Sequence, residues 1–248
     1  MHPLGSLPSF LLLPALSLLG LSGCIGPAAS LTAQGAIVGA DASAAAFLGT
    51  SAQATAFLAV PRDLSDLESN IVDDAERVWV EQRGGDGVDL RNEGSGLYAT
   101  DLSGLAYLPD ASYALTALVD GESHVVTIEA PEAPDLLFGD AHTAGSPFTV
   151  DLGGQGFDHA FGFVVDAGGN ITWDSRPDSD VALVEALRSA EGVDTLVVPN
   201  SAFPVGGSTY IVAVGGFVKA APIDYDGFGG LLSTFAAGKF GSAGLTVR

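Results

Sequence analysis

Residues 113–128 read YALTALVDGESHVVTI, and this stretch decides the fold class of the chain. Apolar side chains alternate with small or polar ones over residues 113–119, and a second alternating run covers residues 122–128. Asp120-Gly121 lies between them, and Asp-Gly between two alternating runs is the strongest short-range signal for a β-hairpin. We therefore predict two antiparallel strands here, each with one face toward a core.

The same period of two recurs along the chain. Residues 51–60 read SAQATAFLAV, with apolar side chains at every second position. A second hairpin is predicted where FGFVV at 161–165 meets ITW at 171–173 across the turn sequence DAGGN. With 33 glycines and 13 prolines, the composition also favours many turns between short strands, so the fold class is predicted to be all-β.

A proline-rich spacer divides the chain. Ala130-Pro131-Glu132-Ala133-Pro134 cannot continue a sheet, because proline fixes its φ angle and donates no backbone hydrogen bond. We predict a linker over residues 131–135 between a first domain at 31–130 and a second at 136–248.

The two halves share an order of landmarks. Trp79 precedes Tyr113 and Trp173 precedes Tyr210 at similar spacing, and each tyrosine follows a turn-like segment and opens an alternating strand. This order resembles the tyrosine corner of immunoglobulin-like and fibronectin-type β-sandwiches. The resemblance implies two tandem Ig-like antiparallel β-sandwiches, in which each tyrosine ring packs inward and its hydroxyl bonds nearby backbone.

One short helix is predicted in the second domain. It begins at Ser179 or Asp180, which can cap it, and ends at Gly192, while the apolar residues 181, 183, 184 and 187 share one side. A shorter helical turn is predicted over residues 64–69.

The N-terminal residues carry a targeting signal. Leu21-Ser22-Gly23-Cys24 closes an apolar stretch without charged residues, and Cys24 is the only cysteine. The motif resembles the lipobox of bacterial lipoproteins. That resemblance implies a signal peptide over residues 1–23, diacylglycerol and an N-acyl chain on Cys24, and a tether over residues 24–30. It also implies an exported, membrane-anchored protein, and Ile25 after the cysteine favours the outer membrane.

The charge of the chain limits its partners. The formal net charge is −21, and a field of that sign repels nucleic acid, so we expect no nucleic-acid partner. A protein or glycan ligand at the surface remains open.

Motifs for catalysis and metal binding are missing from the sequence. Glu93-Gly94-Ser95-Gly96 does not complete Gly-x-Ser-x-Gly, because residue 97 is leucine. His124, His142 and His159 lack the spacing of zinc ligands, even with Asp140 and Asp158 close in sequence to the last two. We therefore expect no catalytic residue, metal site or cofactor beyond the lipid.

One loop is the candidate binding surface. A long connection is predicted between the strand that opens at Tyr210 and a last strand at 243–247, and it holds Asp224, Tyr225, Asp226 and Phe228 as candidate ligand-binding residues. Alternatively, the aromatic residues of this connection fold back into the core, with an additional strand over residues 231–236.

The acidic turn of this loop is also a possible calcium site. An EF-hand loop starting at Asp224 fails, because Phe228 and Phe235 stand at ligand positions. A looser structural calcium site between strands remains open.

These features favour a lipid-anchored envelope protein that acts as a non-enzymatic binding or structural module. One alternative is an envelope hydrolase or carbohydrate-active protein with carboxylates in a cleft between the domains. Another is a subunit of an envelope assembly that adds a partner strand to a free sheet edge.

Overall fold

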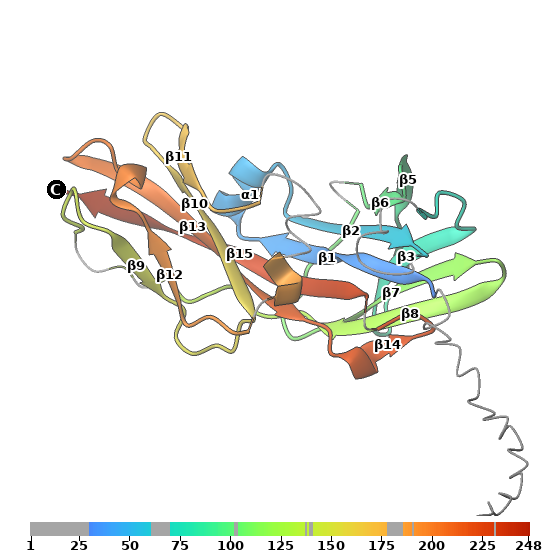
Figure 1. Ribbon diagram of the computed structural model, residues 1–248. Helices are drawn as coiled ribbons and strands as arrows, with labels where there is room; N and C mark the ends of the chain where they lie inside the picture. The colour runs from blue at the N-terminus through green and yellow to red at the C-terminus, as the bar shows by residue number, and fades with distance from the viewer. Residues whose placement is uncertain are drawn as a thin grey trace, which may run out of the picture.

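The computed structural model describes residues 30–60, 70–101, 104–136, 138, 141–177, 186–189, 191–230 and 232–248. Cys24, the signal sequence and the predicted turn at 64–69 lie outside these residues. The prediction of an all-β chain built from sandwich-like sheets is confirmed: one large sheet packs against two smaller ones (Figure 1).

The large sheet has eight strands in the order β11-β10-β13-β15-β1-β2-β6-β5. The second sheet has the order β14-β8-β7-β3-β4, and the third pairs β12 with β9. The strands are β1 (Thr32–Ala40), β2 (Ala52–Ala59), β3 (Arg77–Gln82), β4 (Gly87–Asp89), β5 (Arg91–Gly94), β6 (Leu97–Ala99), β7 (Ser112–Val119), β8 (Glu122–Glu129), β9 (Phe148–Asp151), β10 (His159–Val165), β11 (Ile171–Asp174), β12 (Thr195–Val198), β13 (Ser208–Lys219), β14 (Tyr225–Asp226) and β15 (Thr234–Val247).

Both predicted hairpins are confirmed. β7 pairs antiparallel with β8 across Asp120 and Gly121, whose φ angles of 52° and 76° are those of a type I′ turn. β10 pairs antiparallel with β11. In their turn the backbone and side-chain N–H groups of Asn170 donate to the Asp166 carboxylate, and these bonds lower the pKa of Asp166.

The tyrosine corners are confirmed in both halves. Tyr113 and Tyr210 are each 1% exposed. The Tyr113 hydroxyl accepts from the Leu108 N–H at 2.8 Å and donates to the Ala106 carbonyl at 2.7 Å. The Tyr210 hydroxyl accepts from the Val205 N–H at 2.9 Å and donates to the carbonyl of the same residue at 3.0 Å. Each corner therefore ties the strand to the turn before it.

One feature of the large sheet was not predicted from the sequence. β1, the first strand of the described residues, lies between β2 and β15, and it pairs in parallel with β15 from Gln34↔Thr234 to Ala40↔Phe240. The predicted first domain thus gives β1, β2, β5 and β6 to this sheet, and the predicted second domain gives the other four strands. The division at residues 131–135 stays a prediction. The described residues 130–136 form no strand, as expected.

Side chains on the two faces of the large sheet enter different cores. One face packs against β3, β7 and β8 at one end and against β9 and β12 at the other. The opposite face buries a third cluster that includes Phe161, Phe163, Phe217 and Phe240. Strand alternation explains this split, because neighbouring residues such as Ala160 and Phe161 point to opposite faces.

The described helices differ in part from the prediction. The α-helix α1 (Ala42–Leu48) lies in the first half and was not predicted. Its sequence carries the signals, since Asp41 caps it by accepting from the Ala44 N–H at 2.7 Å and Gly49 ends it with a φ of 77°. Of the helix predicted in the second half, residues 186–189 are helical and most of the rest lies outside the described residues. Two 3₁₀ turns, η2 (Asn200–Ala202) and η3 (Pro222–Asp224), complete the described elements.

Candidate functional site

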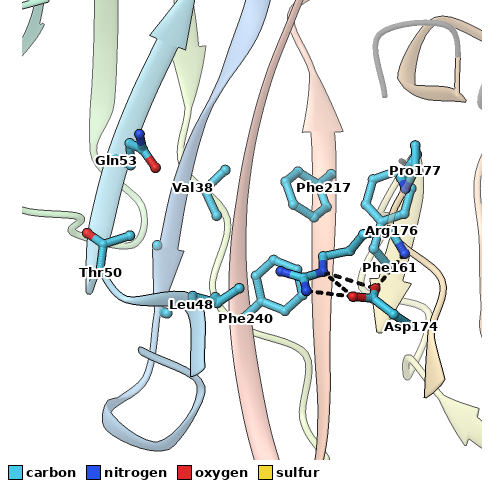
Figure 2. Close-up of a pocket in the computed structure, with 12 residues that line it drawn as sticks. Val38, Leu48, Thr50, Gln53, Phe161, Asp174, Arg176, Pro177, Phe217 and Phe240 are labelled. Carbon is cyan, nitrogen blue, oxygen red and sulfur yellow. Dashed lines mark hydrogen bonds and ion pairs between the residues drawn. The ribbon is translucent and has the colours of Figure 1, made fainter. Parts of the chain in front are cut away.

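A pocket of about 430 Å³ lies on the face of the large sheet that carries the third core cluster. Side chains from β2, β1, β15, β13, β10 and β11 line it, so it runs across six neighbouring strands (Figure 2). Its described lining residues are Val38, Gly39, Ala40, Leu48, Thr50, Gln53, Phe161, Asp174, Arg176, Pro177, Phe217 and Phe240.

The floor of the pocket consists of phenylalanine rings that lie over glycines of the neighbouring strand. Phe240 of β15 is paired with Gly215 of β13, and a Cβ on that glycine would lie 2.8 Å from the ring. Phe217 of β13 is paired with Gly238 of β15, where the distance would be 2.4 Å. Because each ring occupies the space that a side chain would fill at the paired glycine, the rings lie close to the sheet and the floor is closely packed.

The rings of the floor also contact one another. The centroids of Phe161 and Phe217 lie 5.4 Å apart and those of Phe217 and Phe240 lie 5.9 Å apart, both with the rings edge to face. Each of the three residues is only 3% exposed. The floor therefore offers ring edges beside the aliphatic side chains of Val38 and Leu48.

One wall of the pocket carries a rigid ion pair. Nε and Nη2 of Arg176 both bond the Asp174 carboxylate, at 3.0 Å and 2.6 Å. The guanidinium carbon of Arg176 also lies 4.9 Å from the centroid of the Phe163 ring. Two bonds and a cation–π contact hold the guanidinium plane in one orientation. Figure 2 shows this side chain reaching over the floor toward Phe240.

The opposite wall comes from the segment that follows β1. α1 places Leu48 at the rim, and the turn after it leads to Thr50 and then to Gln53 on β2. Asp41 fixes this segment on the sheet, because its carboxylate also accepts from the N–H and hydroxyl of Ser242 at 2.7 Å and 2.9 Å.

His159 lies near the floor, at the start of β10. Its ring centroid is 4.4 Å from that of Phe161. Burial lowers the pKa of His159, and the ammonium group of Lys219 lowers it further. The imidazole beside the pocket therefore favours its neutral form.

The loop predicted to bind a ligand is only partly exposed. The prediction of a last strand that starts near Ala243 is wrong, because β15 begins at Thr234. Aromatic residues of the predicted long connection fold back into the core, as the alternative predicted. Phe228 is 6% exposed and belongs to the core between the two larger sheets.

The other candidate residues of this loop have structural contacts. The Tyr225 hydroxyl accepts from the Phe235 N–H at 2.8 Å, and burial raises the pKa of Tyr225 to about 12. The Asp224 carboxylate accepts from the Ala221 N–H at 2.8 Å, while Asp226 is exposed. A ligand at this loop stays a prediction.

The histidines are dispersed. His142 lies against Phe148 and Phe203, with ring centroids 5.1 Å and 5.2 Å away, and His124 lies against Phe228 at 5.5 Å. Within the described ranges no group of three or more histidine, cysteine, aspartate or glutamate side chains could hold a metal ion. Asp140 lies outside these ranges, and the Asp158 carboxylate accepts from the Lys219 N–H at 2.7 Å.

A second cleft, of about 570 Å³, contains the carboxylates of Asp110, Glu129 and Asp224. The described residues around it include no aromatic side chain. The aromatic pocket, in turn, includes one acid among its described residues, Asp174, which Arg176 already neutralises. Facing acids in an aromatic cleft, the arrangement expected of the hydrolase alternative, are not found among the described residues of these two sites.

The pocket residues were not predicted from the sequence. Gly-x-Phe occurs twice, at Gly215–Phe217 and Gly238–Phe240, and marks two strands whose rings cover each other's glycines. That signal becomes readable only once the strand pairing is known. Asp174 and Arg176 gave no signal, since a short acid–arginine pair is common in turns.

Comparisons with known proteins leave the family open. No family model matches the chain, and no curated protein matches it. Among solved structures it is similar to the crystal structure of chicken CNTN1 FN1–FN3 domains, at 9% identity and a TM-score of 0.19. The match covers 79% of this chain and 62% of that one, which is less than two thirds of the chicken structure. Among the helices of the described residues, none is long and apolar enough to cross a membrane.

Proposed function

We propose that this chain is an envelope protein held at the membrane by lipid on Cys24, and that its β-sandwich body is a non-enzymatic binding module whose ligand occupies the pocket above β1, β15 and β13. The observation that carries the proposal is the pocket itself. Its volume of about 430 Å³ lies in the range of small-molecule sites. It combines an apolar floor with a few oriented polar groups, and this is the usual composition of such sites.

The anchor rests on the sequence Leu21-Ser22-Gly23-Cys24 and on its position. Cys24 to Ser30 is a short segment, and seven residues reach at most about 25 Å when fully extended. β1 begins at Thr32, with only Leu31 between it and this segment. A lipid on Cys24 would thus hold the central strand of the large sheet close to the membrane surface, with the pocket on the same sheet.

The test of the anchor is metabolic labelling with radioactive palmitate, followed by separation of inner and outer membranes. Wild type is expected to carry the label in the outer membrane, and Cys24→Ala is expected to lose both the label and the membrane association. Ser22→Ala is the matched control, because it keeps a small residue before the cysteine and should keep the label. A wild-type protein without label would overturn the anchored part of the proposal.

One observation favours a second candidate function, as a subunit of an envelope assembly. β12 reads Thr195-Leu196-Val197-Val198, and its only strand partner in the described sheets is β9. Val197 is 58% exposed on this uncharged edge strand. Uncharged edges of β-branched residues accept an added strand readily. If the chain assembles in this way, Val197→Lys should abolish co-purification with its partner, whereas Ile223→Lys, at an even more exposed site in η3, should not.

A further inference from the structure

The chemical class of the pocket ligand can be inferred from what each wall requires. No described residue hydrogen-bonds the side-chain amide of Gln53, and Figure 2 shows it at the pocket rim. Nη1 of Arg176 likewise has no partner among the described residues, because its bonds to Asp174 use Nε and Nη2. Both walls therefore offer hydrogen-bonding groups that a bound ligand must satisfy or leave in water.

An acyl chain does not meet this requirement. It would cover the Gln53 amide and Nη1 of Arg176 without giving them a partner. An unpaired buried polar group is unfavourable because it loses its hydrogen bonds to water, and a charged one is more so. The apolar floor alone does not offset that cost, since its three phenylalanines are each only 3% exposed and have little further surface to bury.

An anionic ligand is also disfavoured. Arg176 is the one cation among the described lining residues, and Asp174 neutralises it. A carboxylate or phosphate that reached Arg176 would lie against the Asp174 carboxylate, within the field of a chain whose net charge is −21.

An extended peptide lacks partners for its backbone. Peptides that bind sheets in extended form pair with a free strand edge. The floor of this pocket is instead a sheet face, and the strands beneath it are paired on both sides, from β10 through β13, β15 and β1 to β2. The peptide N–H and C=O groups over the floor would find only the few side chains of the walls.

A neutral saccharide offers hydrogen bonds to both walls, carries no negative charge and has no peptide backbone to pair. We therefore propose that the pocket binds a short neutral oligosaccharide. The apolar C–H faces of the rings pack on the edges of Phe161, Phe217 and Phe240. Neighbouring hydroxyls donate to Asp174 and accept from Arg176 at one wall, and a further hydroxyl bonds the Gln53 amide at the other. Hydroxyls that point out of the open pocket stay hydrated. The inference rests on the proposed binding module and adds its ligand class.

The experiment is isothermal titration calorimetry of the full chain, purified in a detergent without a sugar headgroup. The probes are maltopentaose, cellopentaose and chitopentaose, with octanoate as the acyl probe and an uncharged blocked pentapeptide as the peptide probe. We expect at least one pentasaccharide to bind with a Kd below about 1 mM, the level at which binding exceeds roughly 4 kcal/mol. Arg176→Gln should weaken that binding about tenfold or more, because it removes a charge-assisted donor. Gln53→Ala, on the other wall, should weaken it several-fold.

Arg77→Gln is the matched control. Arg77 bonds Asp89 at 2.7 Å and lies 4.6 Å from the ring centroid of Trp79, so it repeats the ion pair and ring contact of Arg176 outside the pocket. Its substitution should leave the Kd unchanged. Saccharide binding that persists in both Arg176→Gln and Gln53→Ala would overturn the proposal.

The other probes distinguish a wrong ligand class from a pocket that binds no ligand. Binding of octanoate or the peptide that is lost in Arg176→Gln, with no saccharide binding, would overturn the saccharide class and keep the binding module. Failure of every probe to bind would overturn the pocket as the module's ligand site. The palmitate label reports on the anchor independently of these results.

Discussion

Tyr113 and Tyr210 show how one side chain fixes the entry to a strand. Each hydroxyl is the acceptor for a backbone N–H five residues earlier, at Leu108 and Val205. Tyr113→Phe and Tyr210→Phe keep the ring and leave that N–H without its acceptor. We expect each substitution to lower the free energy of unfolding by about 1–3 kcal/mol, measured by urea denaturation. Wild-type stability in both variants would contradict the role of the hydroxyls.

His159 links the stability of the protein to pH. Its pKa is lowered in the folded state by burial and by Lys219. Above the ordinary histidine pKa of about 6.5, neither state binds the proton and His159 adds no pH dependence. As the pH falls below that value, the unfolded chain takes up the proton first, and stability is lost until the pH passes below the folded-state pKa.

The variant His159→Gln isolates this effect. Both proteins share the titration of the carboxylates, so the difference between their free energies of unfolding reports on His159 alone. The free energy of unfolding of wild type minus that of the variant should decrease as the pH is lowered below about 6.5. A difference that stays constant from pH 8 to pH 5, or that rises on acidification, would rule out the neutral imidazole in the folded protein.

At the scale of elements, the packing of β13 beside β15 depends on phenylalanine rings of each strand that lie over glycines of the other. A Cβ at Gly238 would lie 2.4 Å from the Phe217 ring, so the ring would have to shift out of its packing against Phe161 and Phe240. We expect Gly238→Ala to destabilise the protein by about 1–3 kcal/mol through overpacking. Thermal or urea unfolding measures the loss.

Gly244→Ala is the control within the same strand. A Cβ there meets no atom within 4 Å, and the residue is exposed. Alanine in a strand interior is more favourable than glycine by roughly 0.5–1 kcal/mol, so this variant should be neutral or slightly more stable than wild type. Equal losses in the two variants would mean that strand propensity, and not the packing of Phe217, sets the cost.

The elements that were predicted correctly are those whose signals are local. The β7–β8 hairpin follows from Asp120-Gly121 between its own strands, and the corner of Tyr210 follows from a turn five residues away. The helix α1 carried equally local signals in Asp41 and Gly49 and could have been predicted. The pocket could not, because Gln53, Asp174 and Phe240 approach one another only through the order of six strands.

At the scale of the whole molecule, β1 joins the two predicted halves. It pairs with β2 on one side and with β15 on the other, and its alternate side chains enter the core below the large sheet and the cluster that forms the pocket floor. β14, from the second half, also pairs with β8 of the first. A sequence pattern read within each half gives no sign of these exchanges, since parallel pairing of distant strands leaves no local turn.

Because strands of both halves share these sheets, we expect that the second half does not fold alone. In a chain of residues 136–248, β15 loses its pairing with β1 from Thr234 to Phe240, and Phe235 and Ala237 lose the core formed by β1, β7 and β8. Fully burying one large apolar side chain contributes about 1.5–3 kcal/mol, so exposing Phe228 and Phe235, together with the unpaired edge of β15, removes a large part of the 5–15 kcal/mol by which a domain is usually stable. We expect residues 136–248 to lack a cooperative unfolding transition by circular dichroism, whereas residues 30–248, which keep β1, should show one. A cooperative transition in the shorter chain would instead support two independent domains joined at residues 131–135.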